Sequence, residues 1–100
     1  DELWHFYLGG AMELVEIPPD GKPKLSLIGS RIERGEFLQY AVPAGNWFGS
    51  RPAPGSPYCL VGCTVAPGFD FADMEFGSRS RLLSDYPAAR AEILSLTDPD

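Results

Sequence analysis

The sequence predicts a mainly β fold, either a barrel or a jelly roll, that ends in two short helices. Strand-like runs alternate with turns along much of the chain, which contains 11 glycines and 10 prolines. This spacing is typical of antiparallel strands joined by tight turns. After Pro67-Gly68 the spacing of apolar residues becomes helical. A length of 100 residues allows one domain with a single core.

Six stretches are expected to be extended: residues 2–8, 11–17, 22–29, 37–42, 46–50 and 58–66. Gly9-Gly10 can adopt positive φ, so the first two stretches are expected to form a hairpin. The turn sequence Pro-Pro-Asp-Gly ends the second stretch. Residues 30–36 are polar and are interpreted as a loop. The three prolines within residues 51–57 exclude a central strand there.

Two short helices are expected after the last strand. Ser78 is suited to cap the N-terminus of the first helix. Pro87 is suited to the first turn of the second helix. Its apolar stripe is expected on Pro87, Ala91 and Leu94, with Ile93 and Leu96 off the stripe.

The charge of the chain excludes some classes of partner. Acidic residues outnumber basic ones by 14 to 8, which gives a net charge of −6. Proteins that bind nucleic acids normally carry a positive surface, so no nucleic-acid partner is expected. No apolar run is long enough to span a bilayer, so no membrane association is expected. The start of the chain does not resemble a secretory signal.

The two cysteines are not expected to form a disulfide. In an extended strand Cys59 and Cys63 would share a face, about 13 Å apart. A disulfide requires Cα atoms within about 7 Å. We interpret both as small buried side chains. Reduced cysteines fit a cytoplasmic protein.

Three motifs carry a resemblance to a known family. They are DELWHFYLG at the start of the chain, VPAGNWF in the middle, and VGCTVAPGFDFADME near residue 70. In this order and spacing the sequence resembles the Cupin_5 (DUF985) family of the RmlC-like cupin superfamily. The resemblance implies a cupin jelly roll (a double-stranded β-helix barrel) over residues 1–100, matching the C-terminal two thirds of a typical member. The barrel is therefore expected to be incomplete, and the protein to be a homodimer.

The resemblance also bears on metal binding. Glu2 and Gly9 match the end of the first cupin motif, and Pro43 and Gly45 match the start of the second. Phe48 stands where the second motif has a histidine, and phenylalanine cannot coordinate a metal. The other histidines of the usual three-histidine, one-glutamate site would precede residue 1. We therefore expect no metal and no other cofactor.

Two residues are candidates for acid–base chemistry. Glu2 facing the interior of a barrel could act as a general base or bind a substrate hydroxyl. His5 is the only group that titrates near neutral pH without a shift. Strict alternation places Glu2 and His5 on opposite faces of one strand, and only a bulge would bring them together.

Six residues are candidates for ligand binding. They are Trp4, Tyr7, Trp47, Phe48, Phe69 and Asp70. The aromatic residues could form a barrel core or the wall of a pocket. Phe69 and Asp70 follow a Pro-Gly turn and could lie at a pocket mouth. The alternative is structural, with Asp70 and Asp73 accepting hydrogen bonds from backbone or arginine.

Three functions remain open at this point. The first is metal-independent binding of a small molecule, for which the resemblance implies a sugar or other polar metabolite. The second is an isomerase, epimerase or lyase that uses Glu2 or His5 as acid or base, which requires the two groups to converge. The third is a structural role, with dimerisation through an exposed strand. No nucleophile constellation and no phosphate-binding loop is visible.

Overall fold

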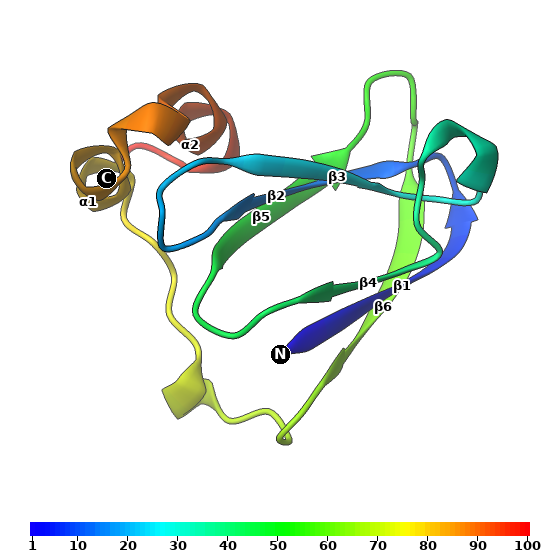
Figure 1. The fold of residues 1–100 in the computed structure, drawn as a ribbon, viewed down its shortest axis with the longest axis horizontal. Coiled ribbons are helices and arrows are strands. Elements are labelled where there is room, and N and C mark those ends of the chain that lie inside the picture. Colours follow the sequence, from blue (N-terminus) through cyan, green and yellow to red (C-terminus); the bar gives the residue numbers. More distant parts are fainter.

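The computed structural model describes all residues 1–100 and confirms the mainly β fold class. Two three-stranded antiparallel sheets face each other, and two short helices lie beside one of them (Figure 1). The first sheet has the order β4-β1-β6 and the second β3-β2-β5. The strands are β1 (Glu2–Gly9), β2 (Met12–Ile17), β3 (Lys24–Ile28), β4 (Gln39–Val42), β5 (Trp47–Pro52) and β6 (Cys59–Val65). The helices are α1 (Arg79–Asp85) and α2 (Arg90–Leu96).

The predicted hairpin of the first two strands is wrong. β1 pairs with β4 and β6, whereas β2 pairs with β3 and β5, so the chain changes sheets at Gly9-Gly10. Gly9 has a φ of +97°, and the amide of Gly10 donates to the carbonyl of Tyr58, 2.9 Å away. The glycine pair therefore makes a corner between two sheets rather than a tight turn within one. This exchange of strands between facing sheets is the connectivity of a jelly roll.

The first core lies between the sheets. Its buried members are Met12, Leu14, Ile28 and Val42. Trp4 and Phe6 of β1 pack against them from the other sheet. These residues meet because alternate side chains of each strand point to the same face.

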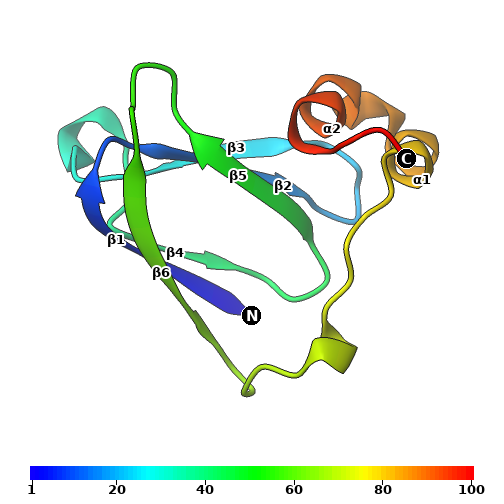
Figure 2. The ribbon, with the colours of Figure 1, turned by 180° about the vertical axis from the view of Figure 1, so that it is seen from behind.

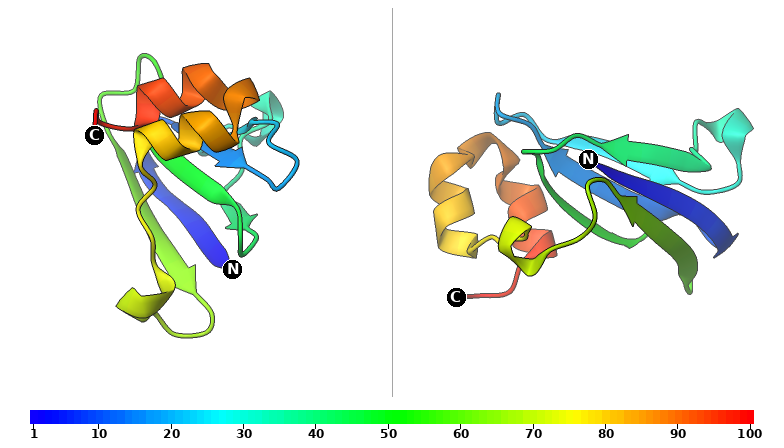
Figure 3. Two further views of the ribbon diagram at one scale, coloured as in Figure 1. Left: turned by 90° about the vertical axis from the view of Figure 1, so that its left-hand side faces the viewer. Right: turned by 90° about the horizontal axis from the view of Figure 1, so that it is seen from below.

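A second core lies on the outer face of β2. Ile17 packs there with Leu82 of α1 and with Ala89 and Ile93 near the start of α2. Figure 3 shows the two helices stacked against this sheet, and Figure 2 shows the same arrangement from behind. β2 is therefore buried on both faces, with all six residues from Met12 to Ile17 inaccessible.

The helix start signals are confirmed, but the predicted apolar stripe is wrong. The Ser78 hydroxyl accepts a hydrogen bond from the Arg81 amide at 3.3 Å. Pro87 begins a 3₁₀ turn, Pro87–Ala89, that leads into α2. Ile93 is 3% exposed and Leu94 is 38% exposed, the reverse of the expectation. The 3₁₀ turn has three residues per turn, so it shifts the phase of the helix that follows it.

Three smaller details also differ from the sequence-based expectations. The loop at residues 30–36 contains a 3₁₀ turn, Ile32–Arg34. β5 extends to Pro52, which sits at the end of the strand where a missing amide is tolerated. Cys59 is half-buried and Cys63 exposed, whereas both were expected to be buried, because β6 is an edge strand; both cysteines are free thiols.

The segment between β6 and α1 runs from the end of the first sheet to the helices (Figure 1). It contains one 3₁₀ turn, Phe71–Asp73, whose preceding residue Asp70 accepts a hydrogen bond from the Ala72 amide at 3.0 Å. This is the backbone-accepting role considered for Asp70. Neither α1 nor α2, at seven residues each, is long enough to cross a membrane.

Candidate ligand site between the sheets

The candidate site includes the face of β1 that points between the two sheets. Glu2 lies opposite Val42 of β4 and Val65 of β6, and Trp4 lies opposite Tyr40 and Cys63. Directly opposed residues in an antiparallel pair share a face. Trp4 belongs to the first core, so this is the face that points between the sheets.

Phe48 contacts Trp4 across the two sheets. Its ring meets Trp4 edge to face, with centroids 6.1 Å apart. Phe48 comes from β5 in the second sheet and Trp4 from β1 in the first. Phe48 remains 40% exposed, so this aromatic pair lies where the space between the sheets opens to solvent.

Trp4 has a polar atom without a partner. Its indole Nε1 is buried and makes no hydrogen bond to any protein atom. An unsatisfied buried donor costs about 1–3 kcal/mol. Native structures contain few such groups, and they often mark a site where a water or ligand supplies the acceptor.

Glu2 influences the thiol beside it. Partial burial of the thiol is the largest cause of a raised Cys63 pKa, and together with the hydrogen bond and the charge of the neighbouring Glu2 carboxylate it brings this pKa to about 11. At neutral pH the thiol therefore stays protonated and can donate to the carboxylate. Glu2 and Cys63 form a small polar pair at the edge of the sheet.

A second carboxylate is buried between the sheets. Glu16 of β2 is 2% exposed. Its carboxylate accepts hydrogen bonds from the Tyr40 hydroxyl and from the Asn46 side-chain amide, the latter at 3.2 Å. Glu16 therefore connects the second sheet to β4 and to the turn that follows it.

Sequence reasoning missed Glu16 as a site residue, although a signal was present. In residues 11–17, Glu16 falls on the same alternating face as Met12 and Leu14. A glutamate that shares a face with two large apolar residues must be buried, and a buried carboxylate needs hydrogen-bond donors. Tyr40 and Asn46 supply them from distant parts of the chain.

Lys24 lies at the edge of this cluster. Its ammonium group is 5.7 Å from the centroid of the Tyr40 ring. A hydrogen bond to Tyr40 and the charges of Tyr40 and Glu16 raise the pKa of Lys24 above its ordinary value. The lysine is therefore cationic at all physiological pH values and partly balances the charge of Glu16.

The structure does not bring Glu2 and His5 together. His5 alternates with Glu2 and Trp4 along β1, and its Nε2 is 2.9 Å from the Thr64 hydroxyl on the outer face. The bulge in β1 comes later, between Phe6 and Leu8, so it does not rotate His5 inward. A molecule held between the sheets therefore cannot contact both groups.

The predicted ligand-binding residues are distributed over several surfaces. Trp4 and Phe48 meet between the sheets. Tyr7 covers Gly62 on the outer face and is 62% exposed. Trp47 packs against the helices on the outer face of the second sheet. Phe69 is 57% exposed and contacts Phe71, beside Asp70 in the connecting segment.

Two cavities are found on the outer side of the second sheet. The larger, about 390 Å³, lies between β2, β5 and the two helices. The smaller, about 250 Å³, lies beside Glu13, Leu25 and Arg51. Between the sheets lies the first core, with the Trp4–Phe48 pair beside it and Phe48 40% exposed.

The sequence profile of the family described as "Cupin superfamily (DUF985)", Cupin_5, matches residues 1–77. The chain belongs to this family. The match spans both sheets, including β1 with Glu2 and Trp4, and the connecting segment up to α1. No curated protein matches the chain.

Two solved structures have the same fold as this Cupin_5 chain. One is the crystal structure of a protein from Shewanella oneidensis, with 36% sequence identity and a TM-score of 0.92. The alignment covers 99% of this chain and 62% of that protein. The other is a hypothetical protein from Leishmania major, with 37% identity and a TM-score of 0.85 over 96% of this chain and 63% of that protein. This cupin chain therefore spans less than two thirds of either relative.

The residues present do not fit the metal site that the cupin fold implies. No three or more His, Cys, Asp or Glu side chains converge anywhere in residues 1–100. The one histidine, His5, faces outward, and the inward position of β5 is occupied by Phe48. We therefore derive no chemistry through a metal from these residues.

Proposed function

We propose that this cupin binds a small hydroxylated molecule, a sugar or similar polar metabolite, at the opening between its two sheets and without a metal. The observation that carries the proposal is the buried Trp4 indole N–H that has no protein acceptor. A ligand oxygen at this point would supply the missing acceptor. This would recover the free energy that the unsatisfied donor costs.

The surrounding side chains favour a hydroxylated ring. Phe48 offers a partly exposed aromatic surface on which the apolar face of a sugar ring can stack. Glu2 offers a carboxylate that can accept from ligand hydroxyls. One donor and one acceptor are thus available on β1, and one apolar surface on β5 of the facing sheet.

The enzymatic alternative uses Glu2 or His5 as acid or base in an isomerase- or epimerase-like reaction. The separation of Glu2 and His5 on opposite faces of β1 argues against a mechanism that needs both. Glu2 alone would remain as the base. The structural alternative, dimerisation without a ligand, leaves the Trp4 donor unexplained.

We further propose that the protein is a homodimer in a cytoplasmic setting. β6 is an edge strand without charged residues, and such an edge can pair with a second copy. The free thiols of Cys59 and Cys63 fit a reducing compartment. Sedimentation velocity would test the dimer directly, and a monomer across the accessible concentration range would contradict it.

Ligand binding can be tested with the two tryptophans. Labelling with 5-fluorotryptophan gives one ¹⁹F resonance for Trp4 and one for Trp47, which Trp4→Phe and Trp47→Phe variants assign. We expect a monosaccharide from a panel of hexoses, pentoses and deoxysugars to move the Trp4 resonance with saturation. Trp47 lies outside the space between the sheets and should not respond.

A carboxylate variant completes the test. Glu2→Gln should weaken the binding of the responding sugar at least tenfold, because hydrogen bonds to charged groups contribute about 1.5–3 kcal/mol. Glu33→Gln, an exposed acid in the Ile32–Arg34 turn, is the matched control and should bind normally. A Trp4 resonance that no sugar in the panel moves would contradict the proposal, as would unchanged affinity in Glu2→Gln.

A further inference from the structure

We propose that the outer cavity between the second sheet and the helices is a separate binding site for a small organic cation, an ammonium group attached to an apolar body. The cavity measures about 390 Å³. Sites for small molecules usually occupy roughly 300–1,000 Å³ and are mostly apolar with a few polar groups. The cavity lies on the opposite face of the second sheet from Trp4, and Phe48 is the one residue that it shares with the proposed sugar site.

The inner wall of the cavity is apolar. Val15 and Ile17 of β2, Trp47 of β5, and Ile93 and Leu96 of α2 line it. Because side chains alternate along a strand, Val15 and Ile17 point away from the face that carries Leu14 and Glu16. A ligand in this cavity therefore meets neither Glu2 nor Trp4, whereas Phe48 also lines the cavity.

The polar lining of the cavity is acidic. Its four carboxylate residues are Glu75, Glu92, Asp98 and Asp100. Arg79 is its only basic residue. An excess of carboxylates around an apolar wall complements a ligand that is cationic at one end and apolar at the other.

Arg79 does not compete for these carboxylates. Its Nε donates to the Thr97 hydroxyl at 2.9 Å, and its Nη2 donates to the carbonyls of Leu94, at 2.8 Å, and of Thr97. These acceptors lie at the C-terminal end of α2, where helix carbonyls favour a cation. The guanidinium is thus held by the helix end, and Asp98 and Glu75 have no ion-pair partner.

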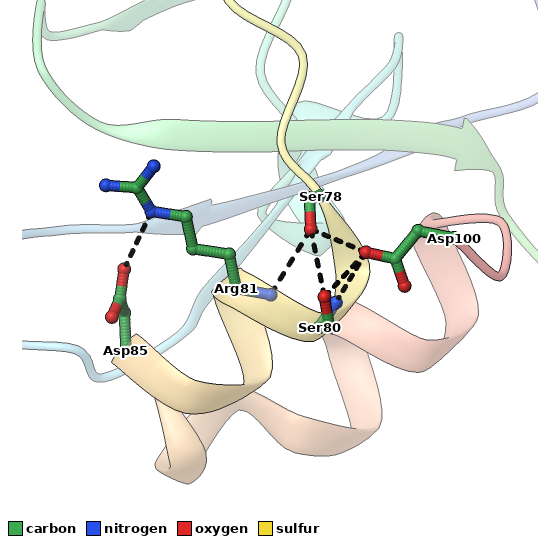
Figure 4. Close-up of polar contacts among 5 residues, drawn as sticks. All are labelled: Ser78, Ser80, Arg81, Asp85 and Asp100. Atoms are coloured by element: carbon green, nitrogen blue, oxygen red, sulfur yellow. Dashed lines mark hydrogen bonds and ion pairs between the residues drawn. The ribbon is translucent and has the colours of Figure 1, made fainter.

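Asp100 is held in place by hydrogen bonds to the start of α1. Figure 4 shows the Asp100 carboxylate accepting from the hydroxyls of Ser78 and Ser80, both at 2.6 Å. The amide of Ser80 also points to this carboxylate, at 3.3 Å. These contacts tie the chain after α2 to the start of α1, so the Asp100 carboxylate is already held in place before a ligand binds.

Trp47 supplies an aromatic surface for the cation. A cation over an indole ring is attracted by the negative face of the ring, most strongly for tryptophan. Trp47 lines the cavity and is also packed on the second core, which holds the ring in place. The same residue reports on binding, because it is one of only two tryptophans.

The experiment titrates 5-fluorotryptophan-labelled protein with phenylethylammonium. We expect the Trp47 resonance to shift with saturation at millimolar concentration or below, and the Trp4 resonance to stay in place. Neutral phenylethanol and anionic phenylacetate have a similar apolar body without the positive charge. They should bind more weakly, with phenylacetate the weakest.

Two variants separate this site from a nonspecific effect. Glu75→Gln combined with Asp98→Asn should weaken phenylethylammonium binding about threefold to tenfold, as expected for two partly exposed charges. Glu33→Gln combined with Asp20→Asn removes the same charge outside the cavity and should leave affinity unchanged. A Trp47 resonance that does not respond would overturn the site. Equal binding of phenylethanol, or equal loss in both double variants, would overturn its assignment to a cation.

Discussion

The Asp100 carboxylate lies 2.6 Å from the Ser78 hydroxyl, which places the residues after α2 directly against the N-cap of α1. The Ser78 hydroxyl has two further partners, because it also accepts from the Arg81 amide and lies 3.2 Å from the Ser80 hydroxyl. The contact joins the two ends of the helical pair (Figure 4). The second core beneath the helices, around Leu82 and Ile93, therefore depends on both hydrophobic packing and this polar closure.

The closure at Asp100 predicts a specific acid dependence. Hydrogen bonds from Ser78 and Ser80 lower the pKa of Asp100 from 3.8 to about 2. Because the pKa is lower in the folded state, the carboxylate stabilises the fold above its unfolded pKa, and this stabilisation is lost as the pH falls toward 2. The difference in melting temperature between wild type and Asp100→Asn should therefore be constant above about pH 5 and shrink below pH 4.

The matched control is Asp20→Asn, an exposed acid whose carboxylate accepts a hydrogen bond from the backbone amide of Lys22. The difference in melting temperature between wild type and Asp20→Asn should not show the same dependence on pH. Loss of the Asp100 effect between pH 7 and pH 5, or persistence of the full effect at pH 2, would contradict the hydrogen-bonded arrangement.

The second core predicts opposite outcomes for two adjacent residues of α2. Ile93 is 3% exposed and packs on Ile17 and Leu82, so Ile93→Ala should lower the free energy of unfolding by about 2–5 kcal/mol. Leu94 is 38% exposed, and Leu94→Ala should change it by less than about 0.5 kcal/mol. Urea denaturation measures both. Equal effects would mean that the helix packs with the phase expected from Leu94 and Ala91.

Local sequence signals predicted where strands and helices begin and end better than they predicted which elements pack against each other. Glycine and proline punctuation located the strands, and Ser78 and Pro87 located the helix starts, because turns and caps depend on a few adjacent residues. The phase of α2 was missed because it depends on a 3₁₀ turn that the sequence pattern does not reveal. The pairing of β1 with β6 joins residues that are 50 to 63 positions apart, from Gly9 with Cys59 to Glu2 with Val65, and only the whole topology determines it.

The candidate site shows the same division. Alternation along β1 correctly separated Glu2 from His5, since it depends only on strand geometry. Alternation could not predict which side of the sheet Trp47 and Phe48 point to. Both follow a turn, and their orientation depends on the strand with which β5 pairs. The contacts of Glu16 with Tyr40 and Asn46 join residues 24 and 30 positions away, so they too required the folded chain.

The buried Glu16 predicts a strong effect at Tyr40. Tyr40→Phe removes the hydroxyl that donates to a carboxylate that is only 2% exposed. Hydrogen bonds to buried charged groups contribute about 1.5–3 kcal/mol, and we expect a loss of that size in the free energy of unfolding. Chemical denaturation at neutral pH provides the measurement. Tyr58→Phe, an exposed tyrosine without a hydroxyl partner, should be nearly neutral.

A double-mutant cycle distinguishes this bond from a general packing effect. Tyr40→Phe should cost much less in a Glu16→Gln background, because the charge that needs the donor is then absent. Additive effects of the two substitutions would show that Tyr40 stabilises the protein through its ring alone.

The pairing of Glu2 with Cys63 predicts how the thiol reacts. The reactive species is the thiolate, and a pKa of about 11 leaves roughly one Cys63 thiol in a thousand ionised at pH 8. In a Cys59→Ser background, alkylation by iodoacetamide should therefore be slow and should keep rising up to about pH 11. Glu2→Gln removes the carboxylate that disfavours the thiolate, so it should lower the pKa of Cys63 and speed alkylation at pH 8.

The size of the fall in the Cys63 pKa separates the contribution of Glu2 from that of burial. Burial is the largest cause of the raised Cys63 pKa, so in Glu2→Gln the pKa should fall but stay above its ordinary value of 9.0. Glu33→Gln should leave the alkylation profile unchanged, because Glu33 lies in the Ile32–Arg34 turn. An unchanged rate in Glu2→Gln would show that the carboxylate points away from the thiol. It would then lie too far from the inward face of β1 to take part in the proposed ligand site.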